Sequence, residues 1–240
     1  MDSLLSTLQR TGAGGAGHKE AGGASASQRV YEDLRRKIIG FALPPDTVLS
    51  RADIAKEYGV SLTPVREALQ QLETEGLVKI FPQSKTLVTR LALNEIHEAQ
   101  LLRIAVETEV VGRLAGACTP AILKRLKTIV SMQEALAGDP EELASFQELD
   151  EMFHRTIMAG IGHERLYDLL KSRSGHFSRL RQLHLPNAGK IANILSDHKA
   201  IIAALEAGDP PLAQKAMREH LSQTIRRIDE LRQQHPDYFT

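Results

Sequence analysis

The stretch from Leu49 to Ile80, LSRADIAKEYGVSLTPVREALQQLETEGLVKI, decides the fold of the amino-terminal part of this chain. It predicts a short helix, a tight turn, a second helix and a strand, in the order that a helix-turn-helix requires. Ser50 followed by Asp53 is typical of a capped helix start. Gly59 stands where a left-handed helix end costs least, so the first helix is predicted to end there.

The second helix of this stretch has an apolar stripe at the helical period. Its members recur at i, i+3, i+4 and i+7 and are Val65, Ala68, Leu69 and Leu72. Arg66 and its polar neighbours lie outside that stripe. Pro64 falls in the first turn, where its missing N–H breaks few hydrogen bonds. One face of this helix is therefore predicted to be buried and the other to be free for a partner.

The flanking segments complete a winged helix-turn-helix over residues 28–91. A helix is predicted from Gln28, because apolar residues recur along one side of it, namely Val30, Leu34 and Ile38. A loop with two prolines follows at Phe41–Thr47. After the helix-turn-helix, Leu77–Phe81 and Thr86–Leu91 are β-prone and separated by four residues, which predicts a hairpin wing.

The composition of the 240-residue chain is that of an ordinary globular protein with one or two domains. Hydrophobic residues make up 42% and charged residues 25%, and the formal net charge is zero. The single cysteine, Cys118, excludes an intrachain disulfide framework and is most simply a small core residue. No apolar run of about 18 residues suggests a membrane span, and the start shows no secretory signal. We expect a cytoplasmic protein, with a flexible Gly/Ala/Ser-rich arm at residues 1–27.

The placement of cations in the predicted head points to a nucleic acid. Residues 27–91 hold ten Lys/Arg and eight Asp/Glu, a net of only about +2. Arg51, Arg66 and Lys85 stand at the start of one helix, on the polar face of the next and at the wing tip. From these positions they can converge on one duplex, with phosphates contacted for affinity and base edges read by the front of the second helix. The alternative is a winged helix that contacts protein.

Beyond Leu91 the pattern is helical throughout, which predicts a mainly α protein with a bundle of six or seven helices over residues 92–235. Helices are expected near Leu93–Ala117, Pro120–Leu136, Glu141–Gly160, Glu164–Leu183, Ala188–Ala207 and Pro211–Gln234. No phosphate-binding glycine loop, nucleophile elbow or paired cysteines occur in it, so the usual enzyme motifs are missing.

The bundle carries a constellation of metal-ligand residues. Asp150 and His154 are four apart on one helix and point the same way. His198 and His220 lie at similar distances on either side of the break at Gly208–Pro210, about 15 Å along each helix at 1.5 Å per residue. In an antiparallel hairpin they would sit at the same level. Three imidazoles and a carboxylate suit zinc, nickel, cobalt or manganese, although Asp150 and His154 alone would more often be a surface pair.

The segment from Val30 to Leu91 resembles the amino-terminal domain of the GntR family of bacterial transcription regulators, and VSLTPVREALQQLETEGLV is similar to the signature of that family. The resemblance implies that four residues contact DNA, namely Arg51, Ser61, Thr63 and Arg66. Leu62 departs from the family, which commonly has arginine there. Ser84 or Lys85 stands where the family usually has a wing-tip glycine. We therefore expect a base preference that differs from that of relatives.

The later helices resemble the FCD ligand-binding domain found in one branch of the same family. The resemblance rests on residues 146–154 and on SDHKAIIAALEAGDPPLAQKAMREHL, and it extends over Leu93–Glu230. It implies that a divalent metal, zinc before the others, is bound by Asp150, His154, His198 and His220. It also implies a small carboxylate effector, with Arg103 facing its pocket, although a salt bridge of Arg103 with Glu107 is an equal alternative.

Together these expectations describe a homodimeric repressor that binds a double-stranded DNA operator. An organic or sugar acid is expected to relieve the repression. Two alternatives remain open: a metalloregulator in which the ion itself is the signal, and a metal-dependent hydrolase. Three further polar residues lie on the helix between the two halves of the site and could contribute to it, although a solvated face is the simpler interpretation: Arg179, Arg181 and His184. Three further histidines have no partner pattern: His97, His176 and His235.

Overall fold

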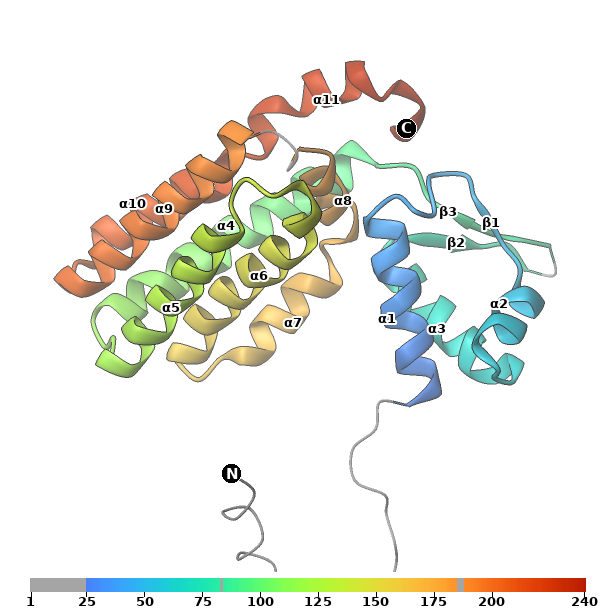
Figure 1. Cartoon of the computed structure of the whole chain (residues 1–240), viewed down its shortest axis with the longest axis horizontal. Helices are drawn as coiled ribbons and strands as arrows, with labels where there is room; N and C mark the ends of the chain where they lie inside the picture. Colours follow the sequence, from blue (N-terminus) through green and yellow to red (C-terminus); the bar gives the residue numbers. More distant parts are fainter. Residues whose placement is uncertain (1–24, 83, 185–187) are drawn as a thin grey trace, which may run out of the picture.

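The computed structural model describes residues 25–82, 84–184 and 188–240, and it places a small head beside a larger helical bundle (Figure 1). The elements of the head are α1 (Ala26–Ile39), β1 (Val48–Leu49), α2 (Arg51–Tyr58), α3 (Leu62–Thr74), β2 (Val78–Ile80) and β3 (Thr86–Val88). Most of the predicted flexible arm, residues 1–24, lies outside the described residues. The predicted mainly α fold with a winged head is confirmed.

The helix caps and the buried stripe predicted for the head are present in the structure. The Ser50 hydroxyl accepts a hydrogen bond from the Asp53 N–H at 3.3 Å, which caps α2. Gly59 ends that helix at φ 63°, a conformation that glycine adopts without steric cost. The predicted apolar stripe of α3 is inaccessible to solvent and packs on α1, the sheet and Ile54 of α2. The helix-turn-helix is therefore held by the stripe that the sequence displays.

Two boundaries of the head differ from the prediction. Helix α1 begins at Ala26 rather than Gln28, because the Ser25 hydroxyl accepts from the Gln28 N–H at 3.1 Å and caps an earlier start. The wing is part of a three-stranded antiparallel sheet with the order β1-β3-β2, in which Val48 pairs with Leu87. Strand β1 was not predicted, because two residues are too few to show an alternating pattern.

The bundle contains α4 (Leu93–Ala115), α5 (Pro120–Leu136), the short η1 (Pro140–Glu142), α6 (Leu143–Gly160), α7 (Glu164–Ser172), α8 (Gly175–His184), α9 (Ala188–Ala207), α10 (Pro210–Ser222), η2 (Ile225–Arg227), α11 (Ile228–Gln234) and η3 (Pro236–Tyr238). Helices α9 and α10 are joined by a turn at Gly208 and pack side by side, as predicted. The half-buried Cys118 packs against the main core, also as predicted. Within the described residues, no helix has the length and apolarity that a membrane crossing needs.

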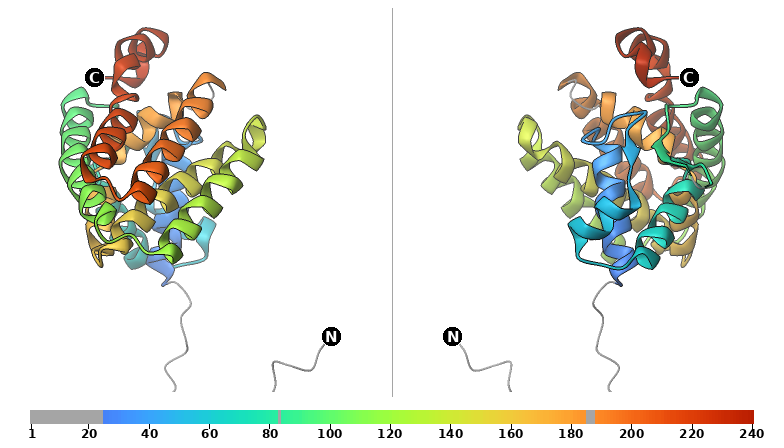
Figure 2. Two further views of the ribbon diagram at one scale, coloured as in Figure 1. Left: turned by 90° about the vertical axis from the view of Figure 1, so that its left-hand side faces the viewer. Right: turned by 90° about the vertical axis from the view of Figure 1, so that its right-hand side faces the viewer.

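Two predicted helices are broken in the structure. The first break separates α7 from α8, and at that point Gly175 approaches the head so closely that a side chain on it would collide with the Glu75 carbonyl oxygen. The second break follows α10, after which Ile228 and Leu231 turn onto Phe177 of α8 in a separate apolar cluster. Figures 1 and 2 show α11, in the darkest red, at one edge of the bundle. Both breaks arise from packing between distant segments, which periodicity within one helix does not reveal.

Candidate metal centre and nucleic-acid interface

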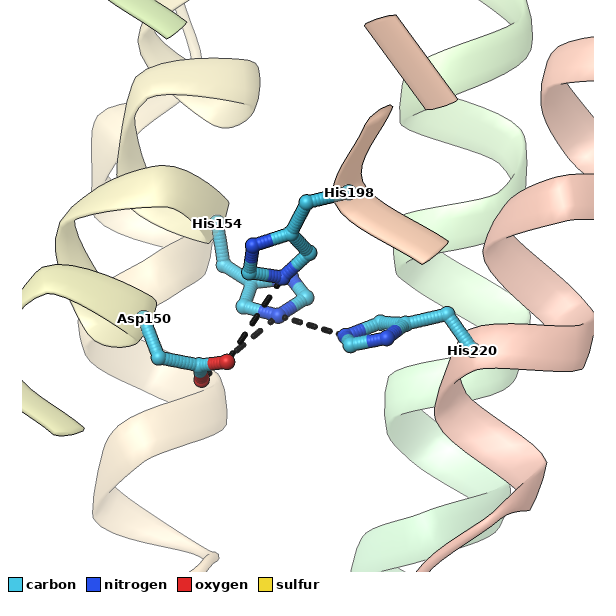
Figure 3. A group of neighbouring side chains, drawn as sticks. All are labelled: Asp150, His154, His198 and His220. Atoms are coloured by element: carbon cyan, nitrogen blue, oxygen red, sulfur yellow. Dashed lines mark hydrogen bonds and ion pairs between the residues drawn. The ribbon is translucent and has the colours of Figure 1, made fainter. Parts of the chain in front are cut away.

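The four residues predicted to hold a metal come together in the interior of the bundle (Figure 3). Helix α6 supplies Asp150 and His154, α9 supplies His198, and α10 supplies His220. All four are buried, and one donor atom from each lies within 4.8 Å of the others. The α9–α10 hairpin sets the two later histidines at one level, and packing of α4 and α5 between it and α6 closes the group off from solvent.

The inner atoms of this cluster lack ordinary partners. Nε2 of His154 lies 3.2 Å from Nε2 of His220, and Oδ1 of Asp150 lies 3.6 Å from Nε2 of His198. Among the described residues, neither Asp150 Oδ1 nor His198 Nε2 has a hydrogen-bond partner. Leaving buried polar atoms unpaired is costly. Three imidazole nitrogens and one carboxylate oxygen converge here, a donor set that fits a divalent transition metal.

Each histidine is oriented from behind by a polar side chain on its other ring nitrogen. The Nδ1 contacts are His154 with Glu107 at 2.6 Å, His198 with Gln133 at 2.9 Å, and His220 with Asp197 at 3.3 Å. Such outer partners fix the ring orientation and leave Nε2 toward the centre. These outer roles were not predicted from the sequence. Asp197 adjoins His198 in the chain, but no sequence spacing singles out Gln133.

Burial and neighbouring charges set the protonation states of the cluster in a way that favours a cation. Burial alone would raise the pKa of Asp150, but attraction to the Arg181 guanidinium holds it well below its ordinary value. Burial, and then the neighbouring His220, lowers the pKa of His198. Burial also lowers the pKa of His220, against the opposing effect of its hydrogen bond to the Asp197 carboxylate. The carboxylate is therefore charged and these two imidazoles neutral at pH 7, which are the forms that ligate metals.

Arg103 forms the salt bridge that was the alternative to an effector contact. Its Nε lies 2.7 Å from Glu107 Oε1, and its guanidinium lies over the Phe177 ring. The same arginine lines a small cavity of about 30 Å³ together with His154 and Arg181. Arg103 thus orients the carboxylate behind His154 and also borders the space next to it.

The prediction that the polar residues of α8 lie on a solvated face is wrong. Arg179 is fully buried and His184 is nearly so, while Arg181 forms an ion pair with Asp150. His176, for which the sequence offered no partner, accepts a hydrogen bond from the Ala92 N–H at 3.2 Å through Nδ1. Because α8 is wedged between the head and α4, its polar residues face protein on both sides.

The residues expected to contact DNA belong to the starts of α2 and α3 and to the hairpin, and Figure 1 shows α2 and the hairpin tip on the side of the head remote from the bundle. They are exposed apart from the half-buried Arg51, and are Arg51, Ser61, Leu62, Thr63, Arg66 and Lys85. Neither Arg51 nor Arg66 forms an ion pair with any residue of the described ranges. Both guanidinium groups are therefore available to an external anion.

The start of α3 has two further properties of a reading helix. Ser61 occupies the N-cap position, yet its hydroxyl makes no capping hydrogen bond, so within the part of the chain that the structure describes it is left available to another partner. Leu62, the next residue, has 58% of its surface exposed. At the wing, the Lys85 ammonium lies 5.9 Å from the centre of the Phe81 ring, which holds it near the tip. Gln83, part of the glycine-poor tip, lies outside the described residues.

Comparisons with known protein families agree with both halves of this architecture. Residues 26–88 match the gntR family of bacterial regulatory proteins, and residues 95–223 match the FCD domain. A regulator of the helix-turn-helix type from an unstable DNA locus of Streptomyces ambofaciens is 34% identical over 220 residues, covering 92% of each chain. The gluconate operon transcriptional repressor of Bacillus licheniformis is 29% identical over 219 residues, covering 87% of each chain.

A solved structure supports the fold. The McbR/YncC protein of E. coli superimposes with a TM-score of 0.72 at 22% identity, covering 88% of this chain and 99% of that one. At this identity the likeness concerns the arrangement of the helices and not their ligands. The matched families and the relatives described above are regulators of transcription, and neither match corresponds to a catalytic domain.

Proposed function

Because this chain belongs to the GntR family of bacterial regulatory proteins and carries an FCD domain after its winged helix, we propose that it is a repressor that responds to a small carboxylate. The carboxylate binds at a divalent metal in the bundle and modulates binding to an operator. We assign residues 1–27 to an arm, 28–91 to the DNA-binding head and 92–235 to the sensing domain. The protein acts in the cytoplasm, where the operator DNA is found.

The single observation that carries the metal proposal is the buried, convergent cluster on α6, α9 and α10. Asp150, His154, His198 and His220 hold the ion, and zinc is our first candidate before nickel, manganese or cobalt. In support, Arg181 occupies one oxygen of Asp150, while the other has no hydrogen bond among the described residues. When bound, the metal supplies a Lewis-acid site for a carboxylate oxygen.

An organic or sugar acid is the effector class that we favour. Arg103 and Arg181 border the cavity beside His154, and guanidinium groups pair well with carboxylates. Entry of an acid requires the cavity to widen, because about 30 Å³ holds no more than a water molecule. In further support, one relative is named for the gluconate operon that it represses, and gluconate is a sugar acid.

A homodimer would place two heads on adjacent half-sites of a pseudo-palindromic operator. In each head, the exposed side chains at the start of α3 face base edges, while Arg51 and Lys85 contact phosphates. Effector binding in the bundle changes the orientation of the heads and thereby operator affinity.

The decisive experiment measures metal content and operator binding together. His198→Ala and His220→Ala should each lose bound metal in elemental analysis while retaining most of the operator affinity of the parent. His163→Ala, an exposed histidine on the same bundle, is the control and should keep its metal. Unchanged metal in both ligand variants would disprove the site. A large shift of operator affinity on adding metal without any acid would instead favour a metalloregulator.

A further inference from the structure

Residues 236–240 pack against the junction between head and bundle. They follow α11 and lie beyond the FCD match, which ends at residue 223. The Leu91 N–H donates to the Tyr238 carbonyl at 2.7 Å, and the Thr240 N–H donates to the Leu91 carbonyl at 3.0 Å. Leu91 belongs to the linker that joins the wing to α4. Segment 236–240 thus pairs with the linker as a one-residue parallel β-bridge.

Side chains strengthen this backbone pairing. Phe239 is 3% exposed and packs in the apolar cluster that contains Leu91, Phe177 and Leu180. The Tyr238 ring stacks on Phe41 of the head, with ring centroids 5.0 Å apart and an angle of 15° between the planes. The same five-residue segment therefore contacts the head, the linker and the bundle.

Phe41 is itself held in an unusual conformation. Its φ is 59°, in the left-handed region that bulky residues rarely adopt. Residues in such conformations persist where the surrounding structure constrains them. Here the constraint comes from Tyr238 and from the Arg179 guanidinium, whose central carbon lies 5.4 Å from the centre of the Phe41 ring.

Arg179 joins the same junction from α8. It is fully buried, and Nη1 donates to the Thr89 carbonyl at 2.6 Å, just before the linker. It forms no ion pair with a described residue. A buried cation without a counter-ion is costly unless its contacts compensate. Its contacts are those that hold the end of the wing and Phe41, which indicates a role at the junction.

We propose that residues 236–240, together with Arg179, form a clasp that fixes the orientation of the winged head on the bundle. The clasp works through Phe41, which precedes the helix-turn-helix and wing in the chain, and through Leu91, which follows them in the linker. Helix α8 also carries Arg181, which is bound to Asp150. Any role of the clasp in transmitting the metal site's state to the head rests on the function proposed above, whereas the clasp itself does not.

The test is hydrogen exchange in the metal-free protein, which makes it independent of the metal proposal. The full chain is compared with one that stops after His235. Loss of the two backbone hydrogen bonds and of buried Phe239 should speed exchange of the Leu91 amide by more than about tenfold, while amides in the middle of α10 stay unchanged. Unchanged protection of Leu91 in the shortened chain would overturn the proposal.

A second measurement keeps the test valid if the shortened chain does not fold. The chain has no tryptophan, so Tyr238→Trp introduces a single tryptophan as the reporter. Its emission should shift to longer wavelength when Phe41→Ala is added, because the ring loses its stacking partner. Leu231→Ala is the matched control, since it removes apolar contacts from the same cluster without touching the linker hydrogen bonds. An equal shift with Leu231→Ala, or none with Phe41→Ala, would contradict a clasp.

Discussion

Nδ1 of His198 on α9 lies 2.9 Å from Oε1 of Gln133 on α5, 65 positions earlier in the chain. An amide oxygen only accepts hydrogen bonds, so the proton of the imidazole is on Nδ1 and the lone pair of Nε2 faces Asp150. Gln133 is fully buried and thus sets the form in which His198 can ligate a metal.

Gln133→Leu should therefore weaken metal binding without removing any ligand. Loss of an outer hydrogen bond to a ligating histidine typically costs about 10–100-fold in affinity. Competition against a chromophoric chelator measures this directly. Met132→Leu, on the exposed neighbouring position of α5, is the control and should leave the affinity unchanged. The outer role would be refuted by equal affinities of the two variants.

Arg66→Ala should weaken operator binding by about 1–3 kcal/mol if the guanidinium reads a base. Arg66 is exposed on α3 and has no ion pair among the described residues, so its loss should leave the fold intact. Gel-shift titration on a duplex selected from a random pool provides the measurement. Arg125→Ala, an exposed arginine on α5, should bind like the parent. Equal binding by Arg66→Ala would exclude a base contact.

Leu62→Arg should change which sequence is preferred. An exposed leucine at the start of the reading helix can make only apolar contacts, for example to a thymine methyl group, whereas arginine can bind guanine through two hydrogen bonds. Selection from random duplexes should yield a guanine at one position in each half-site that the parent does not require. Leu169→Arg adds the same charge to an exposed site on α7 and should leave the selected sequence unaltered.

Stability should fall as the pH drops from about 6.5 to about 4, partly because of His176. Burial, and then the neighbouring Arg179, lowers the pKa of His176 to about 4 from its usual value of 6.5. The unfolded chain therefore takes up a proton first. The contribution is fully present above pH 6.5 and is lost as the pH falls toward 4, by up to about 3 kcal/mol at 1.36 kcal/mol per pH unit.

His176→Gln should reduce the number of protons taken up on unfolding in acid by up to one, so that stability falls less steeply with pH. Urea unfolding at several pH values measures this slope. The exposed His163→Gln should retain the full acid slope. If both variants show the same slope as the parent, His176 does not titrate between the folded and unfolded states in this range.

The sequence alone revealed features that depend on near neighbours in the chain. The caps at Ser50 and Gly59, the apolar stripe of α3 and the α9–α10 hairpin follow from spacing, because helix geometry repeats every 3.6 residues. The spacing also placed Asp150 beside His154, and His198 level with His220, because each of these pairs lies on one helix or on two helices joined by a short turn. The meeting of the two pairs at one ion was what the resemblance to the FCD domain implied.

Only the tertiary structure decided which side chains stand behind and between these elements. Gly175 lies against Glu75 of the head, the Gln133 oxygen lies behind His198, and Thr240 hydrogen-bonds to Leu91. These contacts join segments 65 to 149 positions apart in the chain. Such contacts leave no periodic trace in the sequence, because each depends on how whole helices pack. For the same reason Arg179 and His184, polar in sequence, are buried once α8 lies between the head and the bundle.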